Sequence, residues 1–101
     1  MSMRFEYAAA AVDEVDEALA YYQAIDPALS SRLVREIEEA VHLIQRFPLG
    51  WRPIDDGLRQ RRLKSFPYAF VYTVRGNVIG MIAFANSHRR PGYWRDRLAS
   101  P

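Results

Sequence analysis

The chain has 101 residues, of which half are apolar and 13% aromatic, a composition that excludes an intrinsically disordered protein and fits a single domain, residues 1–101. It contains no cysteine, which excludes disulfides, thiolate metal sites and thiol nucleophiles. No segment approaches the roughly 18 consecutive apolar residues of a membrane span, and the first residues show no secretory signal. We therefore expect a soluble, cytoplasmic protein that makes no membrane contact.

The two halves of the chain carry opposite charge beneath a formal net charge of +2. Residues 1–56 contain five Arg and eleven acids, whereas residues 57–101 contain nine Arg or Lys and a single acid. Such asymmetry is typical of proteins that meet nucleic acid or an acidic partner, although a basic face that is merely solvated gives the same pattern.

The first part of the chain predicts a strand followed by a helix. Residues 3–7 alternate polar and apolar, as a short strand does. From about Ala10 the period changes to steps of three and four, which predicts an amphipathic helix with acids at positions 13–17 filling its first turns. The apolar stripe of this helix consists of Val12, Val15, Leu19 and Tyr22. Asp26 and Pro27 then end one helix and begin the next, as N-cap and first helical residue.

A second helix is predicted over residues 27–47, with an apolar stripe made of Leu33, Ile37, Ala40, Val41 and Ile44. His42 falls on its polar side, and we interpret it as a surface residue. Residues 48–57, PLGWRPIDDG, predict a loop. Two adjacent carboxylates, Asp55 and Asp56, lie in this loop without a nearby His or third acid, which favours a solvated turn over a metal site.

Three further strands are predicted at residues 58–64, 68–75 and 78–85. The first is the most basic, and Gly76-Asn77 between the other two is a tight hairpin signal. The predicted order is β-α-α-β-β-β, an α+β fold in which a helical hairpin packs on a mostly antiparallel sheet. The side chains that we expect to be largely buried are Ile37, Ile44, Phe70, Val71, Ile82 and Phe84.

Short motifs spread over some ninety residues resemble the RelE/ParE superfamily, the toxins of type II toxin–antitoxin modules, once called plasmid-stabilisation proteins. The motifs are Tyr21-Tyr22, Ile44-Gln45-Arg46-Phe47-Pro48 before Gly50, Arg61-Arg62-Leu63, Phe66-Pro67-Tyr68, Val71-Tyr72, His88-Arg89-Arg90-Pro91 and Tyr93-Trp94. The resemblance implies the same β-α-α-β-β-β fold and a cognate antitoxin as partner, with operator DNA contacted only through the toxin–antitoxin complex.

The superfamily divides into two activities. RelE-like members are ribosome-dependent endoribonucleases that cut mRNA without a metal, whereas ParE-like members share the fold and inhibit DNA gyrase. Neither activity implies a cofactor.

Metal-free RNA cleavage needs a base for the 2′-OH, a cation for the phosphate and an acid for the leaving oxygen. The resemblance implies that a nuclease of this kind would use His88, Arg89, Arg62, Lys64 and Tyr93. We expect contacts with a partner or with nucleic acid at Arg59, Arg61, Arg90, Trp94 and Arg97. For Trp94 and Tyr93, covering the sheet is the structural alternative, and Trp51 is expected to pack against the end of the second helix. His88 could equally be a satisfied histidine at the end of a strand, and Arg95 and Arg97 could pair with Asp96 or with the acidic first helix.

One position departs from the nuclease pattern. Ala69 stands where RelE-like toxins carry a substrate-facing Arg, so a main phosphate ligand is missing. The sequence therefore favours a ParE-like inhibitor of DNA gyrase that an antitoxin neutralises. A RelE-like mRNA endoribonuclease, or a degenerate member that retains only antitoxin and operator binding, remains the alternative.

Overall fold

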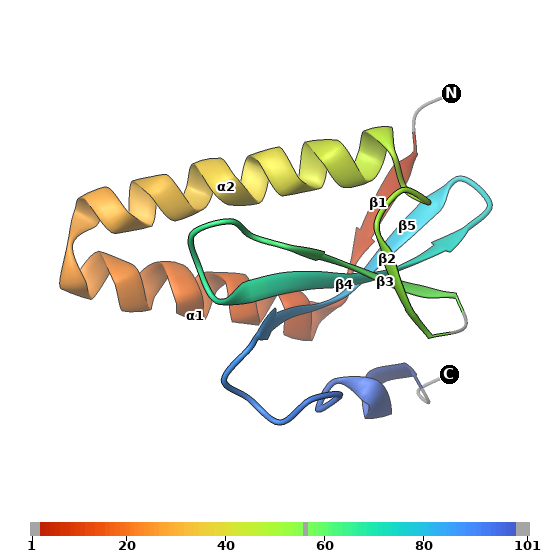
Figure 1. The fold of residues 1–101 in the computed structure, drawn as a ribbon. Helices are drawn as coiled ribbons and strands as arrows, with labels where there is room; N and C mark the ends of the chain where they lie inside the picture. The colour runs from red at the N-terminus through yellow and green to blue at the C-terminus, as the bar shows by residue number, and fades with distance from the viewer. Residues whose placement is uncertain (1–2, 56, 99–101) are drawn as a thin grey trace.

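Two antiparallel helices cover one face of a five-stranded sheet in the computed structural model of the chain, which describes residues 3–55 and 57–98 (Figure 1). The elements are β1 (Arg4–Tyr7), α1 (Ala9–Ile25), α2 (Pro27–Arg46), β2 (Arg52–Asp55), β3 (Leu58–Arg62), β4 (Tyr68–Arg75), β5 (Val78–Asn86) and a 3₁₀ helix (Arg95–Leu98). Within the described residues, no helix is long and apolar enough to cross a membrane.

The strands lie in the order β1-β5-β4-β3-β2, and the predicted α+β class is confirmed. β1 pairs with β5 in parallel, while every other neighbouring pair is antiparallel. A parallel pair needs a long crossover between its strands. The α1–α2 hairpin belongs to that crossover, which places both helices on the same face of the sheet.

The predicted loop over residues 48–57 is wrong in part, because β2 forms within it and adds a strand to the predicted order. Pro53 and the paired acids gave this segment the composition of a loop. Proline is nevertheless compatible with a strand at the edge of a sheet, where one side of the strand needs no donor. β2 is such an edge strand, and Pro53 pairs with Arg59. Of the two acids, Asp55 ends β2, and Asp56 lies outside the described residues.

The helix predictions need two corrections. The first turn of α1, which begins at Ala9, contains no acidic residue, so the expected pairing of acids with the helix dipole in that turn is wrong. Val12 is 43% exposed and does not belong to the core-facing stripe, whose buried members are Ala11 and Ala18. The predicted cap of α2 is confirmed, since the Asp26 carboxylate accepts a hydrogen bond of 3.0 Å from the backbone N–H of Ala28.

The main core lies between the helices and the sheet. Of the predicted core side chains, Ile44, Phe70 and Phe84 belong to it and are no more than 1% exposed, and Ile37 packs against it partly buried. The other two predicted side chains, Val71 at 1% exposed and the partly buried Ile82, lie on the opposite face of the sheet. Trp51 packs against the end of α2 as expected, where its indole N–H donates to the Leu43 carbonyl at 3.1 Å.

A second, smaller cluster lies on the opposite face of the sheet. It consists of Leu58, Val71, Ala83 and Trp94, so the segment that follows β5 returns across the face that the helices leave open. We call residues 87–98 the tail. Figure 1 shows the tail, in blue, running beneath the strands on the side away from α2.

Candidate functional site at the end of β5

One carboxylate ties the tail to the sheet and to α1. β1 pairs with β5 only as far as Met81, and Ile82 is skipped in the pairing of β5 with β4. Beyond this point two backbone groups of β5 are bonded by side chains. The Phe84 N–H donates to Glu14 Oε1 at 3.1 Å, and the Ile82 carbonyl accepts from Arg97 Nη1 at 3.0 Å. Side chains of α1 and the tail therefore make hydrogen bonds to β5 that a neighbouring strand would otherwise make.

Glu14 and Arg97 also bind each other directly. The two terminal guanidinium nitrogens of Arg97, Nη1 and Nη2, donate to the carboxylate at 2.9 and 3.0 Å, so the ion pair is bidentate. The side chain of Glu14 is 11% exposed and that of Arg97 is 22% exposed. Burial alone would raise the pKa of Glu14, but the hydrogen bonds from Arg97, Tyr93 and the Phe84 N–H outweigh it and lower the pKa. The carboxylate is thus held in its charged form.

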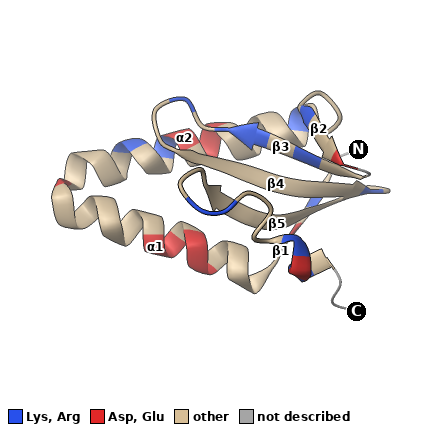
Figure 2. Ribbon diagram, turned by 60° about the horizontal axis from the view of Figure 1, so that its bottom comes forward, with Lys and Arg blue, Asp and Glu red and all other residues tan. Residues whose placement is uncertain are grey.

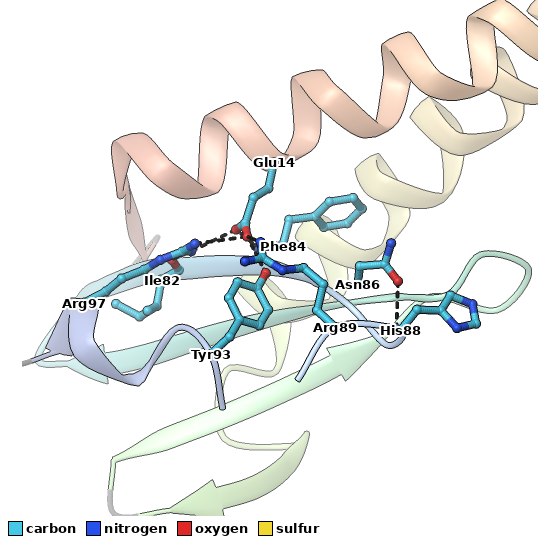
Figure 3. A network of polar contacts seen from close by, with 8 residues as sticks. All are labelled: Glu14, Ile82, Phe84, Asn86, His88, Arg89, Tyr93 and Arg97. Atoms are coloured by element: carbon cyan, nitrogen blue, oxygen red, sulfur yellow. Dashed lines mark hydrogen bonds and ion pairs between the residues drawn. The ribbon is translucent and has the colours of Figure 1, made fainter. Parts of the chain in front are cut away.

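Two further tail residues complete this cluster, which Figure 3 shows converging beneath α1. The Tyr93 hydroxyl donates to Glu14 Oε2, and burial together with this bond raises the pKa of Tyr93 to about 12. Arg89 lies over the Tyr93 ring, 3.7 Å from its centroid, and 3.6 Å from Glu14 Oε2. We call Glu14, Arg89, Tyr93 and Arg97 the clasp. Its polar groups are bonded to one another.

His88 stands apart from the clasp. It follows the end of β5, and its backbone N–H donates to the Asn86 side chain at 2.9 Å. Its imidazole is exposed and points away from the clasp (Figure 3). The structure therefore separates His88 from Arg89 and Tyr93, although they are close in sequence.

The structure also separates the side chains of Arg62 and Lys64. The basic strand was expected to extend to Lys64, but β3 ends at Arg62, so the two side chains do not share a strand face. Lys64 turns toward α2 and pairs with Glu39 at 3.5 Å. The backbone N–H of Lys64 donates to Glu36 at 3.1 Å, which ties the connection after β3 to the helix.

Arg59 and Arg61 face the helical side of the sheet. Arg59 donates to the Trp51 carbonyl at 2.8 Å, and the Arg61 guanidinium lies 4.2 Å from the centroid of the Trp51 ring. Trp94 is only 5% exposed and belongs to the second core cluster, in the position of a sheet-covering residue. Arg90 is exposed on the tail.

A cavity of about 290 Å³ lies between the tail and the outer face of the sheet. Its walls come from β2, β3, β4 and β5, the β3–β4 connection and the tail. The arginines that line it are Arg62, Arg89, Arg90 and Arg95. We call this cavity the tail groove. Neither of the chain's two histidines is among its lining residues.

Acidic and basic residues, which are unevenly distributed along the sequence, are also unevenly distributed over the fold. In Figure 2, Lys and Arg mark β3, the β3–β4 connection and the start of the tail, whereas Asp and Glu mark α1 and part of α2, which also carries arginines. Among the described residues, no three His, Asp or Glu side chains come together as a metal site would require. The arrangement suits the binding of an anionic partner.

Pairing of Arg97 with the acidic first helix was one of the alternatives, and its ion pair with Glu14 of α1 confirms that pairing, but Glu14 itself was not singled out. Its partners lie 70 or more positions away in sequence, so no local motif announces the contact. One signal was available. Glu14 lies three positions after Ala11 and four before Ala18, on the buried stripe of α1, and a charged residue on such a stripe requires a partner in the interior.

Fold and site together define a small α+β protein with a helical hairpin on one sheet face and a basic, clasped tail on the other. The family described as "ParE toxin of type II toxin-antitoxin system, parDE" matches residues 5–91, and the chain belongs to this family. It is thus a toxin component of a type II module, a class of protein whose partner is a cognate antitoxin.

A solved structure shows the same fold. A chain of the chromosomal ParDE toxin–antitoxin system from P. aeruginosa superimposes with a TM-score of 0.71 at 22% sequence identity. The match covers 83% of this chain and 95% of that chain. No curated protein sequence is significantly similar to this one.

Proposed function

We propose that this toxin arrests growth by binding DNA gyrase in the cytoplasm, not by cutting RNA, and that its antitoxin neutralises it. The observation that carries the proposal is the composition of the tail groove. General acid–base catalysis near neutral pH is most often performed by histidine. His42 is exposed on α2, His88 points away from the clasp, and neither lines the groove.

The other groups expected of a nuclease support the same choice. The Tyr93 hydroxyl already donates to Glu14, and a pKa of about 12 makes it a poor proton donor or acceptor at neutral pH. Lys64 is turned toward α2, and Ala69 contributes a methyl group to the groove where a phosphate ligand would be needed. A binding surface requires none of these residues to move protons.

The cell-based test is to induce the chain without its antitoxin and to follow RNA and DNA in the same culture. We expect relaxed plasmid and an SOS response beside intact mRNA, as mapped by primer extension. The His88→Ala variant should retain full toxicity, because its imidazole makes no contact in the clasp or groove.

Two results would overturn the proposal. Codon-phased mRNA cuts that disappear in His88→Ala would identify a nuclease. Unchanged growth, RNA and DNA topology on induction of the folded wild type would identify a member that retains only antitoxin and operator binding.

A further inference from the structure

The floor of the tail groove is made of small residues that face each other across strands. Arg62 of β3 pairs with Ala69 of β4, which pairs in turn with Ala85 of β5. All three line the groove. Ala69 and Ala85 carry only a methyl group, so side chains do not fill the space above this part of the sheet. The tail crosses over that space and leaves it open as the groove. The row therefore combines an apolar floor with a cation at one end.

The arginines around the groove fall into two groups. Arg95 is paired with Asp55 at 2.7 Å, and Arg89 is held by Glu14 and the Tyr93 ring. In contrast, no hydrogen bond or ion pair between residues of the described chain engages the side chain of Arg62 or Arg90. Both of these side chains are exposed, and both line the groove. Two guanidinium groups are thus available to an incoming anion.

We propose that the tail groove binds an extended segment of the antitoxin, with a carboxylate of that segment held by Arg62 and Arg90 and an adjacent aliphatic side chain lying on Ala69 and Ala85. Guanidinium groups match carboxylates in geometry as well as in charge. The methyl floor supplies the apolar contact. This inference rests on the chain being a toxin with an antitoxin partner, and it is independent of gyrase as the target.

The shape of the groove favours an extended protein segment over the other possible occupants. At about 290 Å³ it is at the lower limit of ligand pockets, which run from roughly 300 to 1,000 Å³, so it admits a few side chains but no folded surface. Proteins that bind single-stranded nucleic acid in a basic groove also stack its bases on aromatic side chains. Four aromatic residues line the groove, but Phe66 and Trp94 are buried, Tyr68 stacks on Phe84, and Arg89 covers the Tyr93 ring. The floor between them is alanine.

The experiment measures the affinity of the purified toxin for its purified antitoxin, the neighbouring gene product that restores growth. Arg62→Ala and Arg90→Ala should each weaken binding about tenfold, the scale of one lost charge-assisted contact. Ala69→Leu should weaken it at least as much, because the longer side chain fills the floor. The salt dependence of binding should become shallower in both arginine variants.

Arg75→Ala is the matched control, because Arg75 is exposed at the far end of β4 and does not line the groove. Thermal unfolding confirms that each variant is folded, and Ala85→Leu replaces Ala69→Leu if the latter is not. Antitoxin affinity within twofold of wild type in both arginine variants and in the folded leucine variant would overturn the inference.

The same variants separate this inference from the proposed target. Loss of gyrase inhibition with unchanged antitoxin affinity would assign the groove to the target and overturn the inference while supporting gyrase as target. If the wild-type toxin does not inhibit gyrase but the variants bind the antitoxin more weakly, the groove is confirmed as an antitoxin site and gyrase is excluded as the target.

Discussion

Replacement of Glu14 is the sharpest test of the clasp. Glu14→Ala removes the acceptor for the Phe84 N–H, for the Tyr93 hydroxyl and for the two terminal guanidinium nitrogens, Nη1 and Nη2, of Arg97. Breaking a buried ion pair by removing one partner costs about 3–5 kcal/mol. Because Arg97 is 22% exposed and can turn partly to water, we expect a loss of about 2–3 kcal/mol in the free energy of unfolding. In a domain of this size, that lowers Tm by about 8–24 °C.

The pH dependence of this loss identifies the charge as its source. The pKa of Glu14 is lowered in the folded chain, so its contribution is present above the ordinary value of 4.5 and is lost as the pH falls through the folded-state value. Glu14→Gln should therefore be less stable than wild type at pH 7, and the difference should shrink as the pH falls below about 4.5. Urea unfolding at a series of pH values measures both.

Glu17→Gln is the control, since Glu17 is an exposed acid on the same helix and should change stability by less than about 0.5 kcal/mol. A loss for Glu14→Ala no larger than for this control would show that the ion pair with Arg97 does not stabilise the fold. A gap between wild type and Glu14→Gln that is the same at pH 7 and at pH 3 would show that the Glu14 charge is not its source.

Three further substitutions test packing and the clasp through the free energy of unfolding. Ile44→Ala should cost about 2–5 kcal/mol, because Ile44 is fully buried between the helices and the sheet, and a loss below about 0.5 kcal/mol would contradict that position. Tyr93→Phe should cost about 1–2 kcal/mol at neutral pH. Since the pKa of Tyr93 is raised to about 12, this difference should shrink between pH 10 and 12, and a constant difference would refute the bond to Glu14. Gly80→Ala should cost about 1–3 kcal/mol, because a Cβ at this position would lie 2.7 Å from Thr73 Oγ1. Thr73→Ala in the same chain should recover most of that loss. Additive effects of the two substitutions in a double-mutant cycle would exclude the clash.

Local periodicity was sufficient to predict both helices and four of the five strands. The step from alternation to a three-and-four repeat located α1, and Asp26-Pro27 divided α1 from α2 at the observed cap. β2 was missed because proline and paired acids are typical of loops. An edge position tolerates such residues, and only the pairing of β2 with β3 shows that it is a strand.

The site was predictable in composition but not in arrangement. The arginines of β3 alternate between the two faces, so Arg59 and Arg61 turn to the helices and Arg62 to the tail groove. His88 and Tyr93 are five positions apart, yet one points away from the clasp and the other belongs to it. The clasp depends on contacts between α1 and the tail. Opposite charge on these two segments was enough to suggest that Arg97 pairs with the first helix, but local patterns could not identify Glu14 as its partner or bring Arg89 and Tyr93 to the same carboxylate.

Binding of gyrase, without cleavage of RNA, is the mechanism that we propose for this toxin. Its most direct test is a supercoiling assay with purified DNA gyrase, relaxed plasmid and increasing amounts of the purified toxin. We expect loss of supercoiling that depends on toxin concentration and is reversed by stoichiometric antitoxin. Full supercoiling activity at a large molar excess of folded toxin would exclude gyrase as the target.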